Sequence, residues 1–110
     1  EKAHKKMVNM LAKDGDEILK SVSGEKLDLW HMATGVSGEA GELLDAVKKH
    51  VIYNKELDRE NIIEELGDLE FYMEGLRANL DISRELTLKY NIEKLLTGKN
   101  ARYRKIYNLV

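Results

Sequence analysis

Two segments of the chain share one apolar pattern, and this pattern constrains the fold more than any other feature. In each segment, apolar residues alternate at spacings of four and three, which places them along one narrow stripe of an α-helix. The first stripe comprises Leu29, Ala33, Val36, Ala40, Leu43, Val47 and Val51, and the second comprises Ile62, Leu66, Leu69, Met73, Leu76 and Leu80. We therefore expect two matched amphipathic helices.

The connection between these helices predicts how they are arranged. Asp58 has the character of a helix N-cap, so the second helix is expected to begin directly after it. Only residues 53–57 then remain for the connection, and short connections join antiparallel neighbours. The two segments are therefore predicted to form a helical hairpin with their stripes facing each other.

The flanking segments predict shorter helices. A first helix is expected from His4 to Ser21, weakened around residues 13–16, where the sequence Lys-Asp-Gly-Asp has poor helix propensity. Ser83 resembles another N-cap, opening a helix through about Leu96 that stops near Gly98. Both flanking helices would lie outside the central hairpin.

Composition supports an all-α fold in one domain. The 110 residues include no proline, and charged residues make up 35% of the chain, a balance that favours long, solvated helices. A chain of this size buries only about two thirds of its unfolded surface, so a core shared between subunits is expected. We predict one domain over residues 1–110, an all-α, four- to five-helix bundle-like domain with a central antiparallel helical hairpin, completed by oligomerisation.

Composition also excludes several classes of function. The absence of cysteine excludes disulfides, thiol catalysis and thiolate metal sites. No apolar run approaches the length of a membrane span, and a formal charge of −2 provides no general attraction for nucleic acid. We expect a cytoplasmic protein with neither a nucleic-acid nor a membrane partner.

Four acidic residues are predicted to converge on one side of the hairpin. Glu39 and Glu42 lie on one flank of the first stripe, and Glu65 and Asp68 lie on the flank of the same hand in the second. Antiparallel helices that face each other stripe to stripe are related by a two-fold axis, which keeps like-handed flanks on the same side. The four carboxylates are therefore expected to form one patch.

Such a patch calls for a cation, because close carboxylates repel one another unless their charge is neutralised. With oxygen ligands only, the hard cations Mg²⁺, Mn²⁺ and Ca²⁺ are favoured over zinc, and Mg²⁺ leaves positions open for water and phosphates. The alternative is an ordinary solvated acidic pair on each helix. Gly35 and Gly38 near the first pair, and Gly67 and Gly75 in the second helix, weigh against it, since helix glycines with strong periodicity suggest a close approach.

These residues resemble a known family. The segments from Gly35 to Leu43 (GVSGEAGEL) and from Ile63 to Leu69 (IEELGDL) are similar to the paired E-x-x-E and E-x-x-D motifs of the MazG-like all-α nucleoside triphosphate pyrophosphohydrolases. The likeness extends from about Trp30 to Tyr103. It implies Mg²⁺-dependent hydrolysis of an NTP or dNTP to the monophosphate and pyrophosphate, by attack of water at the α-phosphorus.

The resemblance also implies a set of site residues. Glu39, Glu42, Glu65 and Asp68 become the ligands of Mg²⁺, for which Mn²⁺ is a substitute, and one of the glutamates, left unspecified, activates the water. Residues implied for substrate contact are Trp30 and His31 before the first acidic pair, and Asn91, Lys94 and Arg102 in elements similar to the family's N-x-x-K-L and R-Y. Tyr72, one turn beyond Asp68, is positioned to stack on a base or ribose.

Weaker candidates and rival readings stay open at this point. Asp45 and Glu64 are candidates for indirect support of the site, and Lys48 and Lys49 for phosphate contact; simple solvation is the leading explanation of each. Trp30 and Tyr72 also suit simple packing. The main rival function is a non-catalytic helical dimerisation or interaction module, and a di-iron protein lacks a second Glu-x-x-His motif. For the enzyme, the pocket implied by the family borrows residues across a homodimer or homotetramer interface.

Overall fold

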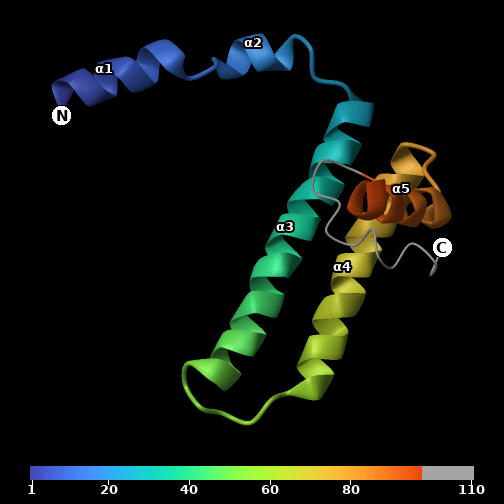
Figure 1. Cartoon of the computed structure of the whole chain (residues 1–110). Coiled ribbons are helices and arrows are strands. Elements are labelled where there is room, and N and C mark those ends of the chain that lie inside the picture. The colour runs from blue at the N-terminus through green and yellow to red at the C-terminus, as the bar shows by residue number, and fades with distance from the viewer. Residues whose placement is uncertain (98–110) are drawn as a thin grey trace.

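A computed structural model of the chain describes residues 1–97, which contain five helices and no strand (Figure 1). The helices are α1 (Lys2–Leu11), α2 (Gly15–Leu19), α3 (Gly24–Val51), α4 (Arg59–Asn79) and α5 (Arg84–Thr97). The predicted all-α class is confirmed. The predicted helix end near Gly98 and the candidate site residue Arg102 lie outside the described residues.

Polar side chains begin the helices as their positions in the sequence indicate. Oδ1 of Asp58 accepts a hydrogen bond of 3.1 Å from the amide of Asn61, and Oγ of Ser83 accepts one of 3.0 Å from the amide of Leu86. Both predicted N-caps are confirmed. The expected first helix is split in two, since Asp14 leaves the helical conformation and caps α2 instead.

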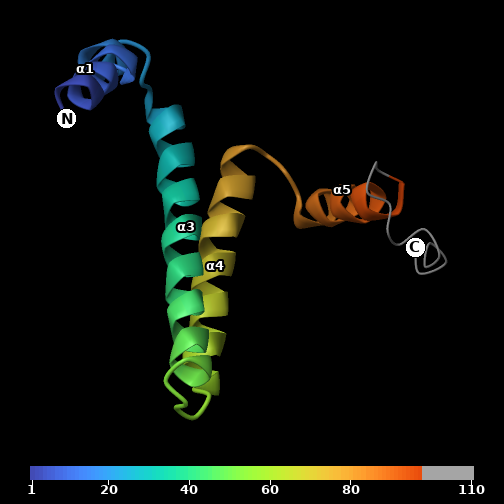
Figure 2. The ribbon, with the colours of Figure 1, turned by 60° about the vertical axis from the view of Figure 1, so that its left-hand side comes forward.

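The two long helices lie side by side and run in opposite directions, joined by residues 52–58 (Figures 1 and 2). Glycines allow their close approach. The ring of Tyr72 covers Gly35, and the sulfur of Met32 covers Gly75, so that a Cβ atom at either glycine would overlap the opposing side chain. Each helix thus receives one large side chain from the other, and we call this α3–α4 unit the hairpin.

The contact between α3 and α4 is rotated from the predicted stripe toward its acidic flank. On α3, the positions shielded from solvent are Leu29, Met32, Gly35, Val36, Glu39, Leu43 and Ala46, whereas the stripe residues Ala33, Ala40, Val47 and Val51 remain exposed. The expectation that the whole stripe faces α4 is therefore wrong. Only half of a broad apolar surface is used, because the glycines that permit close approach lie on the acidic side.

Residues 1–97 of one chain do not close the bundle that the sequence suggests. Among residues 1–97, only α3 and α4 pack extensively against each other, and Ala46 is the one buried residue of the apolar core. The radius of gyration is 19.9 Å, against about 13 Å for a compact chain of this length. The accessible surface is 9903 Å², against about 6,200 Å² for a compact protein of this mass. No helix of the described part is long and apolar enough to cross a membrane.

Candidate metal centre

Three carboxylates from the two long helices meet midway along the hairpin. Glu39 on α3, and Glu65 and Asp68 on α4, each offer one carboxylate oxygen, and these oxygens lie within 4.8 Å of one another. Glu39 and Glu65 are half-buried, whereas Asp68 is exposed. Glu42, the next acidic residue along α3, is exposed and does not belong to this group of three, although its charge acts on Glu65. Three of the four predicted acids are thus brought together, with the fourth nearby.

Crowding at this site falls most heavily on Glu65. A hydrogen bond with Glu39, desolvation, and the negative charges of Glu39, Asp68 and Glu42 all raise the pKa of the Glu65 carboxyl above its usual value. That hydrogen bond requires a proton on one of the two carboxyls. With both ionised, the buried Oε2 atom of Glu65 has no hydrogen-bond partner. A cation at this position would satisfy the oxygen and relieve the repulsion.

No basic side chain neutralises these acids in the part of the chain that the structure describes. Its ion pairs join Lys20 to Glu17, Lys49 to Asp45, and Arg77 to both Glu70 and Glu74. The negative charge of the cluster is therefore uncompensated from within residues 1–97. Oxygen ligands of this kind suit hard divalent cations, so the ligand chemistry and the orphaned Glu65 oxygen both fit a metal site.

Aromatic side chains adjoin the acidic cluster. The ring of Tyr72 lies over Gly35, with its centroid 5.1 Å from that of Phe71 and 6.3 Å from that of His31. His31 and Tyr72 therefore meet across the two helices. Trp30 is 69% exposed and, with His31, lines a shallow hollow on the surface of α3. Two of the predicted substrate residues thus lie together beside the cluster, and Trp30 borders them from α3.

Two further predicted substrate residues, Asn91 and Lys94, are not brought to the cluster by residues 1–97. Asn91 and Lys94 are exposed on α5, which extends away from the hairpin without extensive contact (Figure 2). The weaker candidates have other partners: Lys49 pairs with Asp45 at 3.4 Å, and Lys48 lies 5.8 Å from the centroid of the Tyr53 ring. Glu64 is exposed and outside the group of three carboxylates.

Arg77 is a residue that sequence reasoning missed. Its side chain is only 12% exposed, and its guanidinium lies 2.8 Å from Glu74 and 3.8 Å from Glu70. Nε and Nη2 both donate to the same Glu74 oxygen. The spacing of three between Glu74 and Arg77 signals the helical pair. Nothing in that spacing predicts the shielding of the arginine.

The contact between Gly35 and Tyr72 yields a stability prediction. Gly35→Ala should lower the free energy of unfolding by about 1 kcal/mol, because forcing a methyl group into a packed contact costs roughly 1–3 kcal/mol and exceeds the gain in helix propensity of about 1 kcal/mol. Gly41→Ala is the matched control, since a Cβ atom there meets open space, and it should raise stability by about 0.5–1 kcal/mol. Urea unfolding of the two variants measures the difference. Equal stabilisation by both would show that the ring does not hold this position.

Fold and site together define a class: an all-α protein with a carboxylate cluster between two antiparallel helices, suited to a hard cation. Comparison with known families identifies it more closely. The family model of the MazG nucleotide pyrophosphohydrolase domain matches residues 28–103, and the chain belongs to this family. Comparisons with curated proteins and with solved structures gave no significant match. The predicted resemblance to this family is therefore confirmed.

Proposed function

We propose that the chain is a Mg²⁺-dependent pyrophosphohydrolase that converts an NTP or dNTP to the monophosphate and pyrophosphate. Water attacks the α-phosphorus, a new oxygen–phosphorus bond forms, and the bond from the α-phosphorus to the bridging oxygen breaks. The pyrophosphate leaves with that electron pair. The observation that carries the proposal is the uncompensated cluster of Glu39, Glu65 and Asp68 in a member of this family.

The acids divide naturally into two roles. All four acids would hold Mg²⁺ or its substitute Mn²⁺, with Glu39, Glu65 and Asp68 as the central group. Glu42 would have the second role as well. When bound, the cation neutralises charge on the phosphate oxygens. Glu42 is exposed and outside the group of three, so its carboxylate is the one most free to take the proton of the attacking water. The proton then passes to solvent.

The remaining predicted residues would bind the substrate. His31 and Tyr72 form an aromatic surface beside the cluster, suited to stacking on a base or ribose, and Trp30 borders it. Asn91 and Lys94 do not reach the cluster of their own chain, so we propose that they, with Arg102, approach the phosphates of another copy. Positive charge from these residues would balance the triphosphate.

We further propose that residues 1–110 form one domain, completed as a homodimer or homotetramer. Two measurements support this assembly. The accessible surface of 9903 Å² exceeds that of a compact chain by about 3,700 Å², and large apolar side chains are exposed along all five helices. Stable subunit interfaces bury surface on this scale. The proposed nucleotide substrate is a cytoplasmic metabolite, which keeps the cytoplasm as the expected location.

A second candidate function is a non-catalytic helical interaction module, favoured by the same exposed apolar side chains. Apolar helical faces serve packing more often than chemistry. This candidate differs from the enzyme in one respect that is simple to measure. An interaction module needs no divalent cation and releases no pyrophosphate.

The experiment that tests the proposal is a pyrophosphate-release assay. A panel of standard and modified NTPs and dNTPs would be incubated with the native chain and Mg²⁺, with Mn²⁺, and with EDTA. We expect stoichiometric pyrophosphate and monophosphate with either cation and none with EDTA. Release of inorganic phosphate instead would contradict attack at the α-phosphorus. No product across the panel would favour the interaction module.

A further inference from the structure

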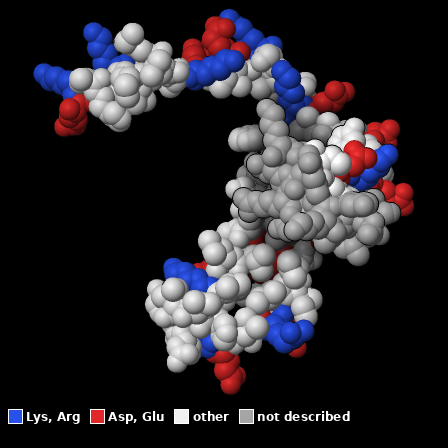
Figure 3. Space-filling view, viewed as in Figure 1, with Lys and Arg blue, Asp and Glu red and all other residues white. Residues whose placement is uncertain are grey.

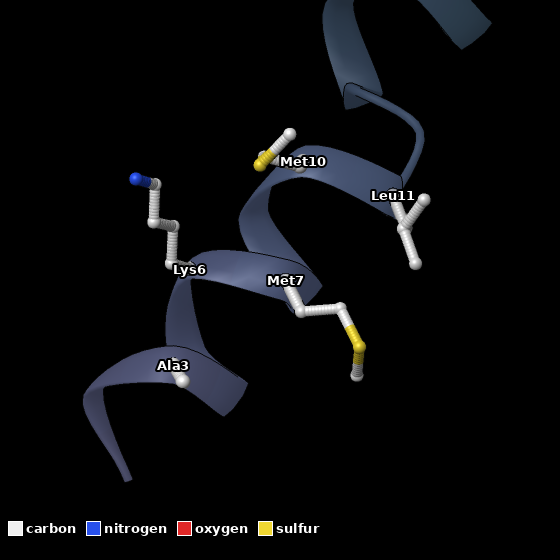
Figure 4. Close-up of a pocket in the computed structure, with 5 residues that line it drawn as sticks. All are labelled: Ala3, Lys6, Met7, Met10 and Leu11. Atoms are coloured by element: carbon white, nitrogen blue, oxygen red, sulfur yellow. The ribbon is translucent and has the colours of Figure 1, made fainter.

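The N-terminal helix α1 presents an apolar surface that nothing else in residues 1–97 covers. Met7, Met10 and Leu11 lie on one side of α1 together with Ala3 and the stem of Lys6, and these five residues line a shallow hollow (Figure 4). Met7 and Leu11 project one turn apart from the same side of the helix. Leu11 is 77% exposed. An exposed apolar side of this kind is typical of a helix that packs against a surface other than its neighbours in sequence.

A second uncovered surface lies on the hairpin. The rotation of the α3–α4 contact leaves apolar side chains exposed on the flank of each helix opposite the acids. We call this the apolar face, and it comprises Ala40, Leu44 and Val47 of α3 with Ile63 and Leu66 of α4. At about 100° per residue these positions form one strip along each helix. The hairpin therefore has an acidic side and an apolar side.

These two surfaces do not meet within one chain. In both views, α1 and α2 project from the end of α3 that is far from the α3–α4 connection, and they lie clear of the hairpin (Figures 1 and 2). The apolar face, by contrast, lies in the half of the hairpin nearest that connection. Neither surface therefore has a partner within residues 1–97.

The two segments that carry these surfaces have opposite net charge. Helix α1 itself carries Lys2, Lys5 and Lys6 and no acidic residue, and Glu1 precedes it as the N-cap. Figure 3 shows basic side chains and one acidic group at this end of the chain. The segment 24–79, which forms the hairpin, has thirteen acidic and six basic side chains. A basic amphipathic helix is attracted to an acidic body and can bury its apolar side there.

We propose that α1 of one copy packs on the apolar face of the hairpin of a second copy. The inference rests on the proposed homo-oligomerisation and names the segment that produces it. One contact then covers both uncovered surfaces and brings together two segments of opposite net charge. Pairing of two apolar faces would instead leave α1 uncovered and bring two acidic hairpins together.

A second copy fits α1 better than an anionic membrane surface does. Helices that lie in a membrane interface are rich in Trp, Phe and Leu on the buried side. Helix α1 has no aromatic residue and only 10 residues. An isolated helix of that length is marginal in water, so packing against protein is what stabilises it. The acidic hairpin would also be repelled by anionic lipid.

Cross-linking tests the proposal directly, because the native chain contains no cysteine. Met7→Cys and Leu44→Cys would be introduced into separate full-length chains, mixed, and treated with a short bismaleimide. We expect a cross-link between positions 7 and 44 of different copies, at least about tenfold more than with Asn9→Cys, which lies on the opposite side of α1. Equal yields from both pairs would overturn the proposal. So would a cross-link formed only when both cysteines share one chain.

Sedimentation of glutamate variants provides an independent measurement. Leu11→Glu and Leu44→Glu should each raise the subunit dissociation constant at least about tenfold, since each replaces an apolar side chain of the proposed contact with a charged one. Asn9→Glu adds the same charge to α1 outside the proposed contact and should raise that constant by no more than about threefold. An oligomer unaffected by Leu11→Glu would refute the role of α1 while leaving oligomerisation intact. Binding to phosphatidylserine vesicles that Leu11→Glu abolishes, with no change of assembly, would assign α1 to membranes instead. Neither the cross-linking yield nor the dissociation constant depends on pyrophosphate release. Failure of this proposal can therefore be told apart from failure of the proposed activity.

Discussion

Asp68→Asn is expected to reduce the rate of pyrophosphate release at least about 100-fold, with little change in the fold. The substitution removes one negative charge from the proposed cation site, and loss of one preorganised electrostatic group typically costs 10²- to 10³-fold in rate. Asp68 is exposed and makes no ion pair among the described residues, so the helix itself should persist. Initial rates at saturating Mg²⁺, with circular dichroism of the same samples, provide the measurement.

Glu60→Gln is the matched control for this loss of charge. Glu60 lies in the first turn of α4, is exposed, and is not one of the three clustered carboxylates. Its rate should stay within about twofold of the native value. If Asp68→Asn kept full activity, the assignment of the cation site to these acids would be wrong. If both variants lost activity equally, the effect would be one of overall charge.

Glu65→Gln is expected to change stability in opposite directions with and without Mg²⁺. For the native chain, Mg²⁺ at 100 times its dissociation constant should add about 2.7 kcal/mol to the free energy of unfolding. In a chain of this size that corresponds to a rise in Tm of at least about 10 °C. Glu65→Gln should lose this increment, because it removes a ligand. In EDTA at neutral pH, however, the variant should melt above the native chain, since the crowded carboxylate is gone.

The dependence on pH identifies the cause of that reversal. The pKa of Glu65 is raised in the folded chain, so the folded state holds this proton more tightly than the unfolded state. In EDTA, stability should therefore fall as the pH rises from the ordinary glutamate pKa through the raised value. Glu65→Gln should remove this part of the slope. Glu60→Gln, measured alongside, should keep the native slope. A metal-free native chain whose stability rose over the same pH range would contradict a repulsive cluster.

Local features of the chain predicted its local structure well. The N-caps Asp58 and Ser83 each mark a helix start, because a short polar side chain satisfies an amide at the first turn whatever surrounds it. The weak segment around Asp14 does separate two helices. The clustering of Glu39 with Glu65 and Asp68 follows from helical periodicity and a short connection. All of these features depend on residues close in sequence or on the two-fold relation between two antiparallel helices.

Other features could not be predicted because they depend on which surfaces meet. The apolar stripe of α3 is broad, and its pattern alone does not tell which half contacts α4. Gly35 decides the matter by admitting the ring of Tyr72, a contact between residues far apart in sequence. The positions of Asn91 and Lys94 relative to the cluster depend on the direction of α5, which is set by no periodicity in the chain.

The reciprocal insertion of Tyr72 over Gly35 and of Met32 over Gly75 has an evolutionary consequence. Both contacts fix how far α3 can slide along α4, and that sliding distance determines whether Glu39 stands level with Asp68. A larger residue at position 35 requires a smaller one at position 72, and a larger residue at position 75 requires a smaller one at position 32. Descendants of this chain should therefore change these positions in pairs, while surface residues diverge independently around an inherited spacing of the acids.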